Sequence, residues 1–512
     1  MKRILVPMSR HHRAMMLPQR DMSGSTAAYN IQSSRLWKEN SYYLNGEWIS
    51  SNEEKTFDVL DPSTEQVIAQ VPDIPEKTST AIAIAHDAGK EWRNSLAKER
   101  SQLLHKIYQL HQEYEEDLAS IISYESGKPL SEAVAEVRYG ASYFQWFASL
   151  HDDEGSMLPS PVPGRTVLST YEPVGVCGLI SPWNFPHAMM ARKVAPALRA
   201  GCTSVLKPSE ETPLTVLALC EILHQAGVPA GVVNCITSAD GQAVGGALTS
   251  AEEVRKISFT GSTAVGQWLT RESAATMKKI SMELGGNAPF IITENADLDA
   301  ALEGLLVSKF RNAGQTCVAT NRVFCHASIY DEFAKRLAQR VAQLQVGRFD
   351  VDGGVDMGPL IHRKSVQRVD ALVQDALNDG AEALVGGSAD GCFYKPTVLV
   401  NVTDSMRVAK EEIFGPVCPL LKFSTDDEVI TRANDTDAGL AAYFYTSSPG
   451  MGRILHFQNQ LEYGMIGCNT GMISSEMTPF GGIKMSGYGR EGSKYGLHEY
   501  QHVKTLALQH DV

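Results

Sequence analysis

The run Val174-Gly-Val-Cys-Gly-Leu-Ile180 opens the part of the sequence that decides the fold. Similar short apolar runs follow at intervals of roughly 25 residues, with helical stretches between them. They are Thr203-Ser-Val-Leu206, Val232-Val-Asn-Cys-Ile236 and Lys256-Ile-Ser-Phe259. This alternation predicts a parallel sheet with helices on both faces. Because nucleotides bind such sheets at the carboxyl ends of the strands, we expect a nucleotide site there.

Helix-terminus signals between these runs support the same interpretation. Gly201 and Gly227 stand where helix C-caps are needed. Thr212 stands where an N-cap is needed, and Pro213 where a first helical residue is needed. Before the runs, residues 78–124 carry apolar side chains at three-to-four spacing, which predicts further helices.

A second alternation of strands and helices begins at Ala288-Pro-Phe-Ile-Ile292. It continues through a predicted helix at 297–310 and the run Arg322-Val-Phe-Cys325. This part starts directly after Glu283 and contains Cys317. We therefore expect a cofactor domain followed by a catalytic domain, with the active site in the crevice between them.

The bulk composition is that of a soluble globular protein of several domains. The chain has 512 residues, of which 43% are hydrophobic and 21% charged, and its mean hydropathy is −0.16. No run of about 18 apolar residues is present, so no spanning helix is predicted. A net charge of −13 argues against nucleic acid and anionic membrane as partners. An anionic substrate would therefore need local arginines.

The nine cysteines form no CxxC pair. Their spacing predicts neither a zinc site nor a disulfide framework, and it fits a reducing compartment. Four of them lie in apolar stretches and are expected to be inert core thiols: Cys177, Cys202, Cys220 and Cys235.

The first residues of the chain are basic, with no acid before Asp21. A mitochondrial targeting peptide has this composition. Pro7 and Pro18, however, interrupt any amphipathic helix. We therefore predict a disordered extension over residues 1–35 and a cytoplasmic protein, with the mitochondrial matrix as the alternative.

Three residues in separate motifs suggest one chemistry. Cys317 ends Gly-Gln-Thr-Cys after an Asn-Ala-Gly turn that can expose its sulfur, and a thiolate can attack a carbonyl carbon and later leave from a thioester. Glu283 ends a strand-like run before a Gly-Gly turn and is a candidate general base. Asn184, in the rigid turn Pro182-Trp-Asn-Phe-Pro186, is a candidate amide donor to an oxyanion.

With these motifs, the sequence from about Leu36 to the C-terminus resembles the aldehyde dehydrogenase family, and within it the NAD-dependent succinate-semialdehyde dehydrogenase branch. The resemblance implies an α/β fold with two parallel-sheet, Rossmann-like domains and a small bridging or oligomerisation β element. It places the NAD-binding domain at 36–150 and 174–285, and the catalytic domain at 286–485. The bridging element takes 151–173 and 486–512.

The resemblance also implies a set of cofactor-binding residues. Lys207 and Glu210 match residues that hold the adenosine ribose, and a carboxylate there repels a 2′-phosphate, so NAD is favoured over NADP. Gly261-Ser-Thr-Ala-Val-Gly266 opens a helix whose N-terminus can face a pyrophosphate, although it is not GxGxxG. The full set is Trp183, Lys207, Ser209, Glu210, Gly261, Ser262, Gly266, Leu284, Glu412 and Phe414.

Arg192 and Arg311 indicate the substrate class. They follow Asn184 by eight residues and precede Cys317 by six, so both are expected at one funnel. In the semialdehyde branch the matching arginines hold the distal carboxylate, and Ser475 matches a serine that assists them. A guanidinium suits this bidentate contact better than an ammonium does. Lys193 matches a lysine near the family's active site.

The resemblance therefore predicts oxidation of succinate semialdehyde to the acid, with NAD, without metal, through a thioester on Cys317. Glutarate semialdehyde and sulfolactaldehyde are alternative small anionic substrates of the same chemistry. A catalytically silent structural or binding protein with this fold is the alternative of another class. A homodimer or homotetramer is expected, with no nucleic-acid or membrane partner.

Overall fold

The computed structural model describes residues 34–51, 54–150, 155–447 and 450–510. The predicted extension at 1–35 lies outside these residues, apart from its last two. Within the described ranges no helix has both the length and the apolar character needed to cross a membrane.

The runs that decide the fold form a six-stranded sheet in the order β23-β11-β10-β7-β8-β9. All neighbouring strands are parallel except β23, which is antiparallel to β11. The predicted strands are confirmed, with ends shifted by up to two residues. Their bounds are β7 Val176–Ile180, β8 Thr203–Lys207, β9 Val233–Cys235, β10 Val254–Thr260, β11 Lys279–Glu283 and β23 Gly487–Tyr488.

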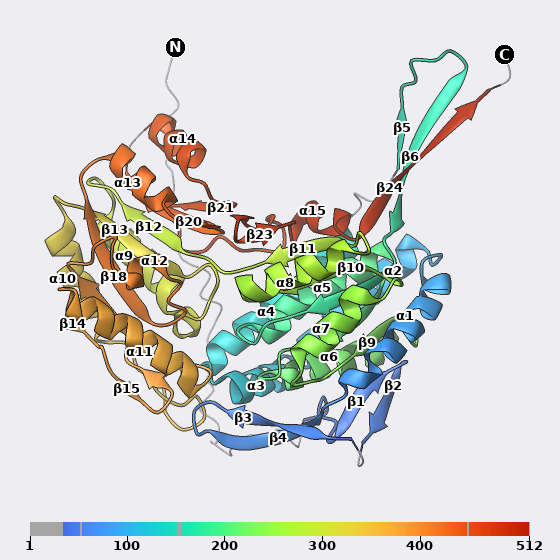
Figure 1. Cartoon of the computed structure of the whole chain (residues 1–512), viewed down its shortest axis with the longest axis horizontal. Coiled ribbons are helices and arrows are strands. Elements are labelled where there is room, and N and C mark those ends of the chain that lie inside the picture. Colours follow the sequence, from blue (N-terminus) through green and yellow to red (C-terminus); the bar gives the residue numbers. More distant parts are fainter. Residues whose placement is uncertain (1–33, 52–53, 151–154, 448–449, 511–512) are drawn as a thin grey trace, which may run out of the picture.

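Helices cover this sheet, and the first part of the chain supplies several of them. Among the helices that cover the sheet, α4 packs against α2, α3 and α5. Two short hairpins, β1–β2 and β3–β4, precede these helices (Figure 1). The bounds are β1 Ser41–Leu44, β2 Glu47–Ser50, β3 Thr56–Asp61, β4 Gln66–Pro72, α1 Thr78–Trp92, α2 Ala97–Glu113, α3 Glu115–Ser126, α4 Leu130–Ser149, α5 Pro186–Ala200, α6 Pro213–Ala226, α7 Gly241–Ser250 and α8 Thr263–Ala274.

The predicted helix ends are confirmed at the C-caps, but one N-cap works differently. Gly201 and Gly227 follow α5 and α6 with φ of 89° and 91°, the left-handed geometry that glycine adopts without strain. Thr212 does precede α6, yet its side chain makes no capping hydrogen bond. The buried carboxylate of Glu125 instead accepts two first-turn amides of α6, at 2.9 and 3.0 Å. Burial raises the pKa of Glu125 to about 8, and the hydrogen bonds from the two α6 amides oppose that shift.

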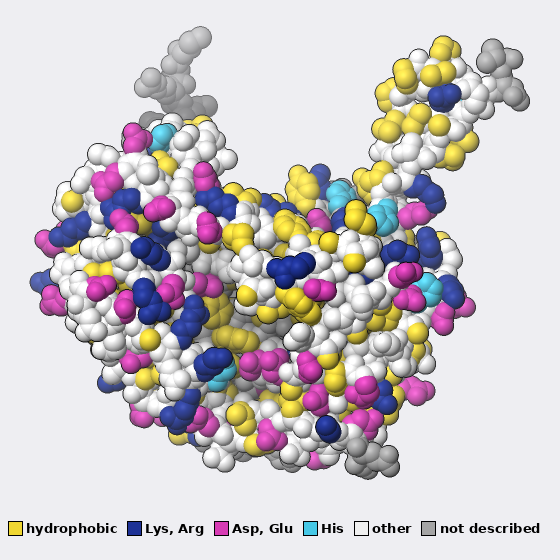
Figure 2. Space-filling view, viewed as in Figure 1, with side chains coloured by type: hydrophobic (Ala, Val, Ile, Leu, Met, Phe, Trp, Pro, Cys, Tyr) yellow, Lys and Arg dark blue, Asp and Glu magenta, His cyan; other side chains and the backbone are white. Residues whose placement is uncertain are grey.

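The second half of the chain builds a seven-stranded sheet in the order β14-β17-β18-β13-β12-β20-β21. Figure 1 shows it beside the first sheet, and Figure 2 shows the surface hollowed between the two halves. The bounds are β12 Ala288–Ile292, α9 Leu298–Phe310, β13 Thr320–His326, α10 Tyr330–Val341, α11 Arg363–Asn378, β14 Glu382–Val385, β17 Thr397–Val400, β18 Val417–Phe423, α13 Asp426–Asn434, β20 Ala441–Tyr445, α14 Met451–Gln460 and β21 Met465–Cys468.

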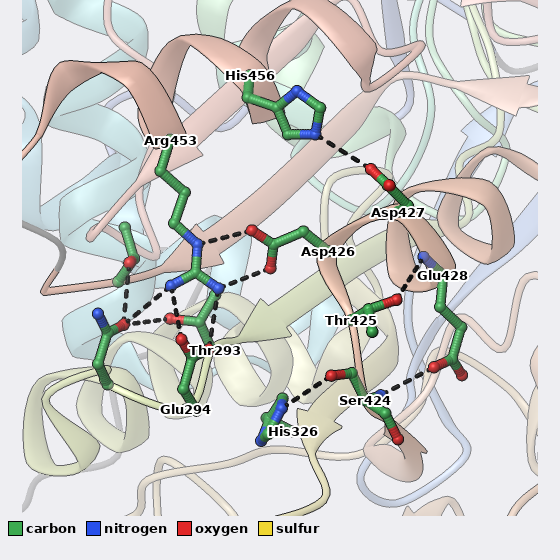
Figure 3. Close-up of polar contacts among 12 residues, drawn as sticks. Thr293, Glu294, His326, Ser424, Thr425, Asp426, Asp427, Glu428, Arg453 and His456 are labelled. Atoms are coloured by element: carbon green, nitrogen blue, oxygen red, sulfur yellow. Dashed lines mark hydrogen bonds and ion pairs between the residues drawn. The ribbon is translucent and has the colours of Figure 1, made fainter.

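One arginine ties the outer helices of this second sheet together. Arg453 of α14 pairs with Asp426 at the start of α13, at 2.6 Å, and with Glu294 after β12, at 2.9 Å (Figure 3). Nearby, the Thr425 hydroxyl caps α13 by accepting the Glu428 amide. These contacts hold α13 and α14 together. They involve none of the site residues predicted from the sequence.

A three-stranded arm projects from the body of the molecule (Figure 1). In it, β6 (Arg165–Pro173) pairs antiparallel with β24 (Gln501–Gln509) on one side and with β5 (Ser156–Leu158) on the other. Apolar side chains lie exposed along the arm (Figure 2), among them Met157 at 75% and Val503 at 65%. Exposed apolar surface of this kind marks a contact surface.

Candidate active site

A cavity of about 480 Å³ collects side chains from motifs far apart in the sequence. Asn184, Arg192, Arg311 and Cys317 all line it, and Glu283 lies buried close by. Much of the remaining wall is apolar, with contributions from Met189, Phe310, Val318 and Phe480. The sulfur and two guanidinium groups therefore share one enclosed, mainly apolar space.

The nucleophile loop owes its shape to three consecutive residues in left-handed conformation. Asn312, Ala313 and Gly314 have φ of 52°, 53° and 73°, and they turn the chain sharply between α9 and Cys317. The Cys317 side chain remains partly exposed. Burial raises the pKa of this thiol to about 12, the Arg192 charge opposes the shift, and the Glu283 charge adds to it. The thiol is therefore protonated at neutral pH and must lose its proton before the sulfur can attack a carbonyl carbon.

Glu283 has the properties of a general base that could activate a water molecule. It is the last residue of β11 and is 2% exposed, and neither carboxylate oxygen has a hydrogen-bond partner among the described residues. Burial raises the pKa of Glu283 well above its ordinary value, and the nearby Glu491 carboxylate raises it further. Arg192 opposes the shift. A carboxylate with a raised pKa accepts protons more readily at neutral pH.

Asn184 lies in the turn between β7 and α5, and the nucleophile loop orients its side chain. Its amide nitrogen donates to the Gln315 carbonyl at 2.9 Å, while its amide oxygen accepts the Phe185 backbone N–H at 3.0 Å. The amide is thus held beside the segment that carries Cys317. Asn184 also lines the cavity.

A buried charge network lies behind the cavity, and Glu491 is at its centre. Its carboxylate forms ion pairs with Arg192 and, at 2.5 Å, with Lys193. Lys193 also donates to the Thr260 hydroxyl at 2.7 Å, and burial lowers the pKa of Lys193. The Arg192 guanidinium stacks over Phe480 at 4.3 Å. Sequence reasoning missed Glu491, because a lone glutamate near the C-terminus carries no motif.

The predicted trio of Arg192, Arg311 and Ser475 is only partly assembled in the cavity. Both arginines line it, and Arg311 lies 5.3 Å from the Phe185 ring. Ser475 does not line it, whereas its neighbour Ser474 does. The reason is local, because the Ser475 hydroxyl is drawn into a turn where it donates to the Thr478 hydroxyl at 3.3 Å.

A second cavity, of about 630 Å³, opens at the carboxyl ends of β8 and β10. Six residues predicted to bind a cofactor line it: Trp183, Lys207, Ser209, Glu210, Gly261 and Ser262. The Lys207 ammonium lies 3.3 Å from the Glu210 carboxylate, and Ser262 caps α8 by accepting the Val265 amide. The helix N-terminus can face a pyrophosphate and the carboxylate can accept ribose hydroxyls, so these residues fit a dinucleotide.

The other predicted cofactor residues lie outside the lining of that cavity. Gly266 allows close packing of α8, since a Cβ there would lie 2.3 Å from Leu284 Cδ2. Glu412 accepts the Gly286 amide at 2.9 Å, and burial raises its pKa to about 7. Phe414 packs edge-on against Trp183, with ring centres 5.5 Å apart. Across the described part of the chain, no cluster of three or more His, Cys, Asp or Glu side chains is placed to hold a metal.

Comparison with known proteins identifies the class. Residues 48–506 match the model of the aldehyde dehydrogenase family. The chain therefore belongs to that family, as its motifs predicted. It is an enzyme that oxidises aldehydes with NAD(P) as the electron acceptor.

Named relatives include several enzymes for anionic aldehydes. The chain is 48% identical to the 3-sulfolactaldehyde dehydrogenase of Pseudomonas putida, over 91% of this chain and 96% of the relative. It is 46% identical to the succinate-semialdehyde dehydrogenase (NADP(+)) GabD of Escherichia coli, over 93% and 99%. The crystal structure of succinate-semialdehyde dehydrogenase from Burkholderia pseudomallei matches with a TM-score of 0.90 at 47% identity, covering 93% of this chain and 98% of the other.

Proposed function

We propose that the protein oxidises a short aldehyde with a distal anionic group, and that succinate semialdehyde is its substrate. The observation that carries the proposal is the presence of Arg192 and Arg311 in the wall of the cavity that contains Cys317. The cavity is also lined by Glu132, Glu136 and Asp356, so it is not uniformly basic. A neutral aldehyde gains little from guanidinium groups, whereas a carboxylate gains charge-assisted hydrogen bonds from them.

In the proposed mechanism, the Cys317 thiol gives its proton to solvent water, and its sulfur attacks the aldehyde carbon. The aldehyde oxygen becomes an oxyanion that accepts from the Asn184 amide and the Cys317 backbone N–H. NAD(P), when bound, supplies the hydride acceptor. The resulting thioester on Cys317 is hydrolysed by a water molecule whose proton goes to Glu283, and the acid and the free thiol are released.

NAD is the proposed cofactor, with NADP less favoured. Glu210 lines the cofactor cavity with a side chain that is 45% exposed, so its carboxylate is available to ribose hydroxyls. A 2′-phosphate would meet this negative charge, which Lys207 offsets only in part. The Escherichia coli and Schizosaccharomyces pombe relatives are named as NADP(+) enzymes, so the preference needs a direct test.

We also propose that the chain forms a homodimer or homotetramer through the exposed apolar arm of β5, β6 and β24. The cytoplasm is the proposed compartment. The relative from Arabidopsis thaliana is named mitochondrial, which keeps the matrix as the alternative.

The test is steady-state kinetics, followed by NADH absorbance, on succinate semialdehyde, glutarate semialdehyde, sulfolactaldehyde and butanal. We expect kcat/KM for an anionic aldehyde to exceed that for butanal by at least about tenfold, the value of one charge-assisted hydrogen bond. Cys317→Ala is the control for background oxidation. Glutarate semialdehyde and sulfolactaldehyde are included because relatives at 47% and 48% identity carry those names. A preference for butanal would overturn the proposal.

A further inference from the structure

The segment that leads into α4 contains a buried ion pair outside the mechanism described above. Lys128 Nζ lies 2.6 Å from Glu136 Oε2, and the two side chains are 1% and 0% exposed. Moving two charges out of water costs several kcal/mol for each ion unless further hydrogen bonds satisfy both groups. The remaining partners of this pair therefore indicate what it is for.

Those partners all belong to the turn that carries the oxyanion donor. Lys128 Nζ also donates to the backbone carbonyl of Asn184, at 2.8 Å. The other oxygen of Glu136 accepts the backbone N–H groups of His187 and Ala188, at 2.9 and 3.3 Å. The ion pair thus holds the turn at Asn184 itself and again in the first turn of α5. Its charges make these contacts stronger than neutral hydrogen bonds would be.

The same helix also reaches the nucleophile loop. Glu132, one turn before Glu136, accepts the backbone N–H of Asn312 with both oxygens, at 3.1 and 3.0 Å. The Asn312 side-chain amide then donates to the Asn184 carbonyl at 3.0 Å. Asn312 has a φ of 52°, a backbone conformation that costs energy in a non-glycine residue. The start of α4 therefore holds both loops that flank Cys317.

We propose that Lys128 and Glu136 are positioning residues for the oxidation step, because they set the direction of the Asn184 amide relative to Cys317. The inference rests on the proposed role of Asn184 as oxyanion donor. Glu136 lines the Cys317 cavity, but the effect does not require that either side chain touch the substrate. A misplacement of a catalytic group by about 1 Å can lower the rate about a hundredfold. Removal of either charge should therefore slow formation of the thioester and leave the intrinsic reactivity of the thiol unchanged.

The experiment uses full-length Lys128→Met, in which the aliphatic stem is kept and the charge is lost. Two rates are compared with wild type: the pre-steady-state NADH burst at saturating NAD, and alkylation of Cys317 by iodoacetamide. Alkylation needs the thiolate but no oxyanion donor. We expect the burst to slow by about ten- to a hundredfold and alkylation to be unchanged. An unchanged burst, or a parallel fall in both rates, would overturn the inference.

Glu125→Gln is the matched control for Glu136→Gln. Glu125 is also a buried acidic side chain that accepts two first-turn amides, those of Leu214 and Thr215 in α6, and no hydrogen bond between it and the oxyanion turn is found among the described residues. We expect Glu136→Gln to slow the burst and Glu125→Gln to leave it unchanged at saturating NAD. Equal slowing in both variants would mean that general destabilisation of the domain is responsible.

Asn184→Ala distinguishes a failure of the proposed oxyanion role of Asn184 from a failure of the proposed positioning role of Lys128 and Glu136. If it leaves the burst unchanged, the oxyanion role itself fails. If Asn184→Ala slows the burst while Lys128→Met does not, the oxyanion role stands and the positioning role fails.

Discussion

Arg311→Met tests the assignment of the substrate class most directly. The Arg311 side chain is half-buried in the wall of the Cys317 cavity, and its guanidinium lies 5.3 Å from the Phe185 ring. No ion pair or hydrogen bond of this guanidinium is found within the described ranges, although its charge lowers the pKa of the nearby Glu132 against the effect of burial. Its donors are therefore available to a ligand. Methionine keeps the length and apolar stem of the side chain while it removes the charge.

The size of the effect follows from the contacts that are lost. A hydrogen bond to a charged group contributes about 1.5–3 kcal/mol, which corresponds to roughly ten- to a hundredfold in kcat/KM. This loss should appear with succinate semialdehyde. With butanal, a neutral aldehyde of the same carbon count, kcat/KM should change little, because butanal has no carboxylate for Arg311 to bind.

Arg192→Met is the companion variant, and its expected behaviour is different. The Arg192 guanidinium is fully buried and paired with Glu491, so its removal leaves that carboxylate with Lys193 as its remaining ion-pair partner at close range. Breaking a buried pair costs about 3–5 kcal/mol of stability. We expect a lower Tm and a similar loss of kcat/KM on both aldehydes. If Arg311→Met also lowers kcat/KM equally on both aldehydes, the assignment to anionic substrates is refuted.

Three further predictions concern the base, the nucleophile and the cofactor. Glu283→Gln should give at most one NADH burst per active site, because thioester hydrolysis loses its base; steady turnover at the wild-type rate would exclude Glu283. Alkylation of Cys317 by iodoacetamide should keep rising with pH beyond about pH 10, since burial raises the thiol pKa to about 12 and only the thiolate reacts; a plateau near pH 8 would contradict this. Glu210→Ser should reduce the ratio of kcat/KM with NAD to kcat/KM with NADP, because the negative charge that faces the 2′-phosphate is removed. If the wild-type enzyme prefers NADP, the attraction of Lys207 for the 2′-phosphate outweighs its repulsion by the Glu210 carboxylate.

Sequence periodicity was a good guide to the strands because it is a local property. The run at Ala288–Ile292 is β12 with the same bounds, and the predicted C-cap glycines follow α5 and α6. Nearly all positions of these parallel strands are buried, so each strand carries a short apolar run that can be recognised in the sequence. Motif spacing also led to Cys317 and Asn184, which the structure places at one cavity.

Contacts between distant elements could not be predicted in the same way. Glu136 lies in a helix where acidic residues usually face solvent, and only the packing of α4 against α5 shows that it is buried. Likewise, the role of Glu491 can be recognised only from the structure, in which residues of β10 and α5 lie around its carboxylate. Ser475 differs from expectation by one position, because a turn that ends at Thr478 decides which of two adjacent serines faces the cavity.

The two arginines of the cavity therefore have different electrostatic surroundings, although the sequence presents them as equivalent. Arg192 is paired with Glu491, and its charge lowers the pKa of both Cys317 and Glu283 against the effect of burial. A substrate carboxylate that bound Arg192 would compete with Glu491 and weaken this effect on the nucleophile and the base. Arg311 forms no ion pair among the described residues, and its acidic neighbour Glu132 is also bonded to the Asn312 backbone N–H. Selection of the anionic group is thus expected to depend mainly on Arg311, while Arg192 offsets part of the effect of burial on the pKa values of Cys317 and Glu283.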